Sequence, residues 1–90
     1  MSNFFDVAGK TVLITGGNSG LGKGMALAFR DAGAHVAVTG RNPDKNAVAA
    51  EELGADVALY PLDVRDEAAV AATVSAVASR FGALDILINN

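Results

Sequence analysis

Short apolar runs alternate along this chain with longer stretches whose apolar residues recur at spacings of three and four. The short, β-branched runs are typical of buried strands, and the longer spacing is typical of amphipathic helices. Their order predicts βαβαβαβ. Strands that alternate with helices form a parallel sheet joined by right-handed crossovers. The expected fold class is therefore α/β, with a doubly wound parallel sheet.

The boundaries of the expected elements follow from apolar spacing and from capping residues. The expected strands are residues 11–15, 36–39, 57–60 and 84–88. The first expected helix ends at Gly33, and its single apolar face consists of Leu21, Met25, Ala28, Phe29 and Ala32. Asn42 and Asp66 are expected to cap the second and third helices, which end at Gly54 and Gly82.

The turn between the first strand and the first helix is rich in glycine. Five of the ten glycines lie there, at positions 16, 17, 20, 22 and 24. Glycine allows the backbone to turn sharply and to approach a ligand closely. Backbone N–H groups at a helix start, aided by the helix dipole, favour an anion such as a diphosphate. The context predicts a cofactor site, and the alternative is a tight turn that binds nothing.

The same turn satisfies most of a phosphate-binding P-loop, because Gly17 is followed by Gly22 and Lys23 at the required spacing. A P-loop continues with a serine or threonine whose hydroxyl binds Mg²⁺, and Gly24 occupies that position here. Asp63 would have to serve as the acidic metal partner. The missing hydroxyl argues against an NTPase, and Lys23 is better interpreted as a solvated lysine in the first helical turn.

Three short motifs lie at the ends of expected strands. The turn has the spacing Thr-Gly-x-x-x-Gly-x-Gly, carried by Thr15, Gly16, Gly20 and Gly22. Asp-Val at residues 63–64 follows the third expected strand, and Asn-Asn at residues 89–90 ends the fourth. Together these motifs resemble the short-chain dehydrogenase/reductase family, which has Asn-Asn-Ala-Gly after its fourth strand. The resemblance covers the chain from about Lys10 onward. It implies a Rossmann-type fold and an NAD(P)-dependent oxidoreductase that forms a homodimer or homotetramer.

The resemblance also assigns cofactor contacts to individual residues. In the turn, the predicted cofactor-binding residues are Gly16, Asn18, Ser19, Gly20, Leu21 and Gly22. Asp63 and Val64 are expected near the adenine, and Asn90 is expected near the ribose. The alternative is that Asp63 simply faces water and that Val64 is a packing residue.

The end of the second expected strand bears on the choice of nicotinamide cofactor. Units that bind NAD place an acidic residue there, which accepts hydrogen bonds from the ribose hydroxyls. This strand ends Thr39-Gly40-Arg41-Asn42 and has no acid. Gly40 leaves room where a carboxylate would repel a 2′-phosphate, and Arg41 supplies a cation suited to phosphate. The prediction is NADP(H), with NAD(H) as the alternative, and the alternative for Arg41 is an ordinary exposed loop residue.

None of the family's catalytic residues is expected in this chain. The resemblance implies hydride transfer to or from a carbinol or carbonyl carbon, with a Tyr-x-x-x-Lys pair handling the hydroxyl proton. Tyr60 is the only tyrosine, Pro61 follows it, and position 64 is valine. We therefore expect cofactor binding without catalysis from these residues. The loops that bind the small-molecule substrate follow later strands of this fold. The resemblance suggests a sugar acid or a 3-oxoacyl compound as the substrate class.

Composition and charge argue against several other classes. The formal net charge is −3 and no lysine or arginine cluster is present, which argues against nucleic acid and anionic membranes as partners. Without cysteine, disulfides and thiolate metal sites are ruled out, and no metal site is expected. No apolar run approaches the ~20 residues of a membrane span. Residues 1–5 do not look like a signal peptide, so we expect a cytoplasmic protein.

Residues 1–90 are predicted to be the N-terminal part of a single NAD(P)-binding domain, truncated after its fourth strand. A doubly wound sheet normally has further strands beside the fourth, and a four-stranded unit by itself would expose an apolar edge. The main alternative in function is a non-catalytic nucleotide-binding module or regulatory homologue, which would keep the turn without the chemistry.

Overall fold

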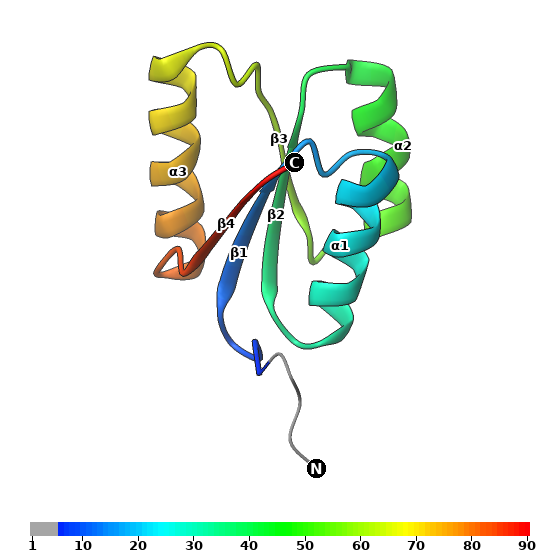
Figure 1. The fold of residues 1–90 in the computed structure, drawn as a ribbon, viewed down its shortest axis with the longest axis vertical. Coiled ribbons are helices and arrows are strands. Elements are labelled where there is room, and N and C mark those ends of the chain that lie inside the picture. The colour runs from blue at the N-terminus through cyan, green and yellow to red at the C-terminus, as the bar shows by residue number, and fades with distance from the viewer. Residues whose placement is uncertain (1–5) are drawn as a thin grey trace.

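The computed structural model describes residues 6–90, so the expectation about a signal peptide concerns residues 1–5, outside that part. A single parallel sheet lies between two layers of helices (Figure 1). Its strands are β1 (Thr11–Thr15), β2 (His35–Gly40), β3 (Ala58–Pro61) and β4 (Ile86–Asn89). Helices α1 (Gly20–Asp31) and α2 (Pro43–Leu53) cover one face, and α3 (Glu67–Phe81) covers the other. Within residues 6–90, no helix combines the length and hydropathy that crossing a membrane requires.

The strand order is β3-β2-β1-β4, and every neighbouring pair is parallel. The α/β doubly wound fold predicted from the sequence is therefore confirmed. The chain moves outward from β1 through β2 to β3 and then crosses back to place β4 on the other side of β1. The sheet thus has a topological switch point between β1 and β4, and ligands of such sheets bind beyond the carboxyl ends of the strands there.

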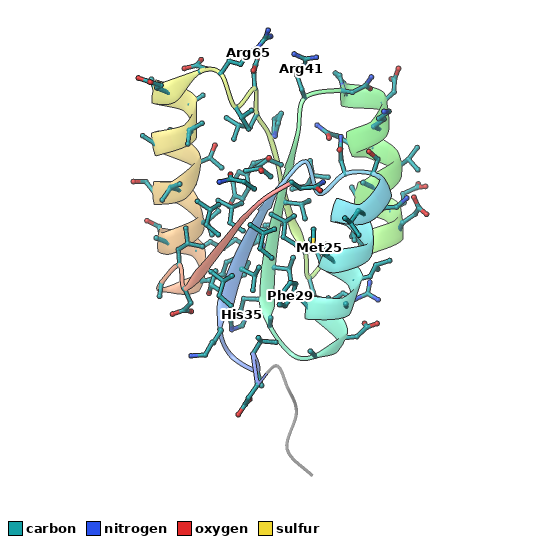
Figure 2. All side chains as sticks on the ribbon, viewed as in Figure 1. Met25, Phe29, His35, Arg41 and Arg65 are labelled. Atoms are coloured by element: carbon teal, nitrogen blue, oxygen red, sulfur yellow. The ribbon has the colours of Figure 1, made fainter. Side chains whose placement is uncertain are left out.

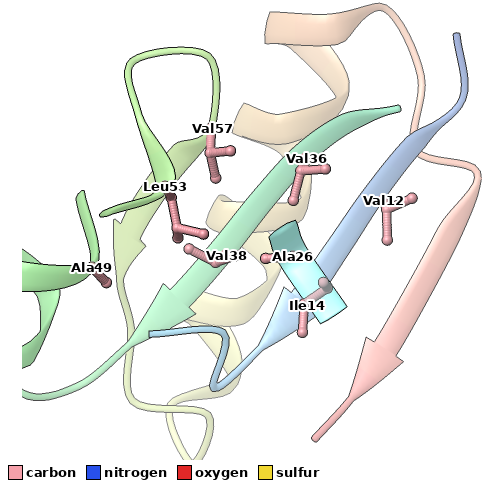
Figure 3. Packing of buried hydrophobic residues seen from close by; sticks show 8 residues of the cluster. All are labelled: Val12, Ile14, Ala26, Val36, Val38, Ala49, Leu53 and Val57. Carbon is pink, nitrogen blue, oxygen red and sulfur yellow. The ribbon is translucent and has the colours of Figure 1, made fainter. Parts of the chain in front are cut away.

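The core consists of two apolar layers, one on each face of the sheet. Alternate residues of β1 and β2 point to opposite faces, since successive side chains of a strand do so. Those facing α1 and α2 form the larger layer (Figure 3), which contains Val12, Ile14, Ala26, Val36, Val38, Ala49, Leu53 and Val57. Leu13, Ala37, Ala58 and Val77 form the layer under α3. Full burial of each large aliphatic side chain contributes about 1.5–3 kcal/mol to the stability of the fold. The buried side chains of β1 and β2 therefore stabilise the packing of the helices on both faces of the sheet.

The caps predicted for the second and third helices are confirmed. Asn42 Oδ1 accepts hydrogen bonds from the backbone N–H groups of Asp44 at 2.9 Å and Lys45 at 3.1 Å. Asp66 Oδ1 accepts one from Ala69 at 3.0 Å. Both helices end as expected, with positive φ at Gly54 and Gly82, a conformation that is cheap only for glycine.

The apolar face predicted for the first helix is only partly correct. Leu21 is 74% exposed, and the buried residues of α1 are Gly22 and Ala26. The other predicted residues, Met25, Ala28, Phe29 and Ala32, line an apolar groove of about 300 Å³ together with Val7 and Ile88. Met25 and Phe29 are partly buried and pack against the larger core layer, whereas Ala28 and Ala32 are exposed.

The expected fourth strand began two residues too early, because Asp85 has another role. The Asp85 carboxylate accepts a hydrogen bond from the Thr11 backbone N–H at 2.8 Å, and the Asp85 N–H donates to the Thr11 carbonyl at 3.0 Å. Strand pairing with β1 starts only after this residue, at Ile86 opposite Val12. The third strand is also shifted by one residue from the expected range.

We expect Asp85→Ala to destabilise the fold by about 1–3 kcal/mol, because the buried Thr11 N–H would lose its acceptor. Asp85→Asn retains an oxygen that can accept the same bond and should lose much less. Chemical denaturation of the two variants beside the parent chain measures the difference. Equal losses for alanine and asparagine would contradict the role assigned to this hydrogen bond.

Candidate functional site

The glycine-rich turn follows β1 directly and lies over the carboxyl end of the sheet. Gly16 and Gly20 adopt positive φ angles of 68° and 58°, and they mark the two ends of the turn. The Gly16 N–H donates a hydrogen bond to Thr39 Oγ1 at 3.3 Å. Thr39 is buried at the end of β2, so its hydroxyl fastens the turn to the neighbouring strand. The sequence prediction does not include Thr39, since nothing in the local pattern distinguishes it from a core threonine.

Two further glycines of the turn allow close packing. A Cβ on Gly17 would lie 2.5 Å from Val38 Cγ1, within the core. A Cβ on Gly22 would lie 2.5 Å from Asn90 Nδ2 and would collide with the Gly16 carbonyl oxygen. The first turn of α1 therefore packs directly against the backbone at the start of the glycine-rich turn.

The N-terminus of α1 differs from those of α2 and α3. Ser19 is its N-cap residue, but the Ser19 side chain makes no capping hydrogen bond, and no acidic residue lies in the first turn. By contrast, α2 and α3 have both a side-chain cap and an acidic residue there. The positive end of the α1 dipole and its free N–H groups are therefore not compensated from within residues 6–90, an arrangement suited to an anion.

Asn46, on α2, connects the turn to the end of β2. Asn18 Nδ2 donates to Asn46 Oδ1 at 2.9 Å, and Asn46 Nδ2 donates to the Gly40 carbonyl at 2.9 Å. The side chains of Asn18 and Asn46 fill the space in which a Cβ of residue 40 would lie. The expectation that Gly40 leaves empty room is therefore corrected, because two amide groups occupy that space.

Asn46 was not predicted from the sequence, although its spacing from two apolar residues of the same helix was a signal. Asn46 is only 8% exposed and shares the buried face of α2 with Ala49 and Leu53, at spacings of three and four. A polar side chain on the buried face of a helix needs hydrogen-bond partners. That requirement indicates a contact with another segment, but it does not identify Asn18 or Gly40 as the partner.

Charged residues gather where the loops after β2 and β3 meet (Figure 2). Asp63 accepts hydrogen bonds from Arg65 Nη2 at 2.7 Å and from Arg65 Nε at 3.0 Å. These bonds hold the pKa of the Asp63 carboxyl well below its usual range. Arg41 Nη1 lies 4.0 Å from the same carboxylate. His35 lies at the opposite end of β2, far from this group.

The end of β4 completes the arrangement. The Asn90 backbone N–H donates to Thr15 Oγ1 at 3.2 Å, and Asn90 Nδ2 donates to the Gly16 carbonyl at 3.2 Å. Asn90 is 75 residues from Thr15 in the chain. The parallel pairing of β1 with β4 brings these residues together.

These segments surround a pocket of about 290 Å³ beyond the carboxyl ends of the strands. The predicted site residues that line it are Gly16, Asn18, Arg41, Asp63, Val64 and Asn90. Thr39 and Arg65 also line it and are absent from the sequence prediction. Four predicted residues, Ser19, Gly20, Leu21 and Gly22, lie outside the lining, at the junction of the turn with α1.

Comparison with known families agrees with this geometry. The family model described as short chain dehydrogenase matches residues 10–90, which include the turn, the Asp-Val pair and the terminal Asn-Asn. The chain belongs to the short-chain dehydrogenase family. The resemblance stated from the three motifs is thereby confirmed, and so is the Rossmann-type fold.

Relatives in the short-chain dehydrogenase family are similar over most of this chain. A probable 2,4-dienoyl-CoA reductase of Bacillus subtilis is 42% identical over 84 residues, covering 90% of this chain and 33% of the relative. A short chain dehydrogenase structure from Bacillus anthracis has a TM-score of 0.87 and 38% identity, covering 96% of this chain and 36% of that one.

A third relative has been solved with a ligand. The 3-ketoacyl-(acyl-carrier-protein) reductase of Brucella melitensis, complexed with NADH, has a TM-score of 0.83 and 41% identity, covering 90% of this chain and 33% of that one. The chain thus spans about a third of the length of these relatives.

Proposed function

We propose that residues 1–90 are the N-terminal part of one NAD(P)-binding domain and bind a nicotinamide dinucleotide in the pocket described above. The observation that carries the proposal is the N-terminus of α1, which has no side-chain cap and no acidic first turn. It adjoins a glycine-rich turn at the switch point of the sheet. An anionic diphosphate suits these free N–H groups.

Individual residues are proposed to hold different parts of the cofactor. The turn from Gly16 to Gly22, including Asn18, Ser19, Gly20 and Leu21, would bind the diphosphate. Asp63 and Val64 would lie beside the adenine, and Asn90 beside the ribose. The pocket supports this assignment, because at least one residue from each of the three motifs lines it.

Arg41 is the basis for favouring NADP(H) over NAD(H). It lines the pocket and is 69% exposed, so its guanidinium is accessible to a 2′-phosphate. Position 40 carries no carboxylate that would accept hydrogen bonds from ribose hydroxyls or repel the phosphate. NAD(H) is the alternative, and the NADH complex of the Brucella melitensis reductase is the observation that favours it.

We expect the protein to bind NADPH about tenfold more tightly than NADH. The reason is that a charged hydrogen bond between arginine and phosphate lowers a dissociation constant by at least about tenfold. Arg41→Gln should remove most of that difference by weakening NADPH while leaving NADH almost unchanged. Fluorescence titration of both cofactors measures the two affinities. Tighter binding of NADH by the parent protein would contradict the preference.

The whole protein is proposed to be an oxidoreductase. When bound, the nicotinamide supplies or accepts a hydride, and the partner is an alcohol or carbonyl group of a small-molecule substrate. A sugar acid or a 3-oxoacyl compound is the proposed class, and a cytoplasmic homodimer or homotetramer is the proposed form. Family membership and the names of the relatives as dehydrogenases and reductases support the oxidoreductase activity. Assays of the whole protein for NADP⁺ reduction with sugar acids and for NADPH oxidation with 3-oxoacyl compounds test the two substrate classes.

A further inference from the structure

Two arginines and one carboxylate meet at the rim of the pocket. Asp63 accepts hydrogen bonds from Arg65 Nη2 at 2.7 Å, from Arg65 Nε at 3.0 Å, and from the Arg65 backbone N–H at 3.0 Å. Arg41 Nη1 lies 4.0 Å from Asp63, which is beyond hydrogen-bond distance. Asp63 is therefore paired with Arg65 and is only a neighbour of Arg41.

This difference matters because Asp63 and a bound phosphate would compete for the same guanidinium. An arginine paired through two hydrogen bonds with a carboxylate has its planar fork occupied and its charge largely compensated. If Asp63 paired with Arg41, a 2′-phosphate would approach a neutral ion pair and a repelling carboxylate. With Asp63 paired to Arg65, the fork of Arg41 is available at the pocket.

We propose that Arg65 is a positioning residue for phosphate recognition: it holds Asp63 and thereby keeps Arg41 free for the 2′-phosphate of an adenosine ribose. The inference rests on the proposed function, because it concerns the adenosine end of the same pocket. Arg65 reaches Asp63 locally, from two residues further along the chain. Arg41 lies in the loop after β2, so its side chain can reach either the Asp63 carboxylate or the 2′-phosphate.

Removal of Arg65 is expected to leave a charged competitor for Arg41 at neutral pH. The ordinary pKa of an aspartate is about 3.9, so the Asp63 carboxyl remains ionised when Arg65 is removed. Arg65 is 75% exposed and Asp63 is 34% exposed. Substitution of Arg65 therefore removes little packing, and a loss of phosphate recognition would not come from unfolding.

The experiment compares two nucleotides that differ only in the group under test. Binding of 2′,5′-ADP and of 5′-AMP is measured by calorimetry. The dissociation constant of 5′-AMP divided by that of 2′,5′-ADP reports recognition of the 2′-phosphate alone. The variants are Arg65→Gln, Arg65→Gln with Asp63→Asn, and Arg80→Gln as the matched control. Arg80 lies at the other end of α3 and carries the same charge. Melting curves establish that each variant is folded.

Arg65→Gln is expected to lower the ratio about fivefold, a modest factor because ion pairs between exposed side chains couple weakly. The double variant should restore the ratio, since the neutral amide no longer competes for Arg41. Arg80→Gln should leave it unchanged. A ratio unaffected by Arg65→Gln, or a loss that Asp63→Asn does not restore, would overturn the positioning role.

Failure of the proposed function gives a different result from failure of this inference. A parent protein that binds neither nucleotide has no adenosine site, and a parent that binds both equally has no 2′-phosphate site. In either case both proposals fall. If the parent discriminates between the nucleotides and Arg65→Gln discriminates equally well, the cofactor site stands and only the inference about Arg65 is overturned.

Discussion

Gly22→Ala is expected to destabilise the protein by about 1–3 kcal/mol, the usual cost of overpacking, and to weaken NADPH binding by about tenfold or more. The added Cβ would collide with the Gly16 carbonyl oxygen and lie 2.5 Å from Asn90 Nδ2. A backbone carbonyl cannot rotate away as a side chain can. Relief of the collision therefore requires α1 to move away from the turn, which would displace the N–H groups proposed to hold the diphosphate.

Gly24→Ala is the matched control, because it makes the same chemical change two residues later in α1. A Cβ at Gly24 would meet no atom within 4 Å. Alanine is favoured over glycine within a helix by roughly 0.5–1 kcal/mol, so this variant should be slightly more stable and should bind NADPH normally. Thermal melts and NADPH titrations of both variants provide the comparison. Similar behaviour of the two would show that the contact between Gly22 and Gly16 is unimportant.

Placing an acid at the end of β2 is expected to fail as a route to NAD(H) preference. Gly40→Asp should destabilise the protein by about 1–3 kcal/mol and lower its affinity for both cofactors, because Asn18 and Asn46 fill the space beside residue 40. Asn46 is 8% exposed and donates a hydrogen bond to the Gly40 carbonyl, so its side chain cannot move aside to make room for a new one. Gly40→Ala, which adds only the Cβ, should show most of the same loss of stability.

A second substitution separates the steric cause from the electrostatic one. Asn46→Ala alone should cost about 1–2 kcal/mol through its lost hydrogen bonds, yet it should make Gly40→Asp better tolerated. The double variant should then be more stable than the sum of the single losses predicts, with its preference shifted toward NADH. Denaturation curves give the coupling, and cofactor titrations give the preference. Strictly additive losses would contradict the steric account.

Elements that depend on neighbouring residues could be predicted from the sequence. Strand β1 has the expected bounds, because its apolar, β-branched run is immediately followed by glycine. The caps Asn42 and Asp66 were predicted because each bonds to N–H groups two or three residues away. The start of β4 was missed because Asp85 bonds to Thr11, 74 residues earlier in the chain.

The same distinction applies to the candidate site. Its motifs are contiguous stretches, and the glycines at positions 16, 20 and 22, placed between an expected strand and an expected helix, predicted an anion-binding turn. The roles of Thr39, Asn46 and Arg65 were not predicted. Asn46 contacts a residue 28 positions away, and Thr39 contacts one 23 positions away. Arg65 is close to Asp63 in sequence, but its importance depends on Arg41, which arrives from another loop.

By itself, the sequence determined the order of the elements, the family and the location of the glycine-rich turn. These properties reside in apolar periodicity, caps and motifs that each span a few residues. Only the tertiary structure decided which face of α1 is buried, what fills the space beside Gly40 and which arginine holds Asp63. The physical reason is that these contacts join separate loops and helices, whose relative positions follow from the strand order β3-β2-β1-β4.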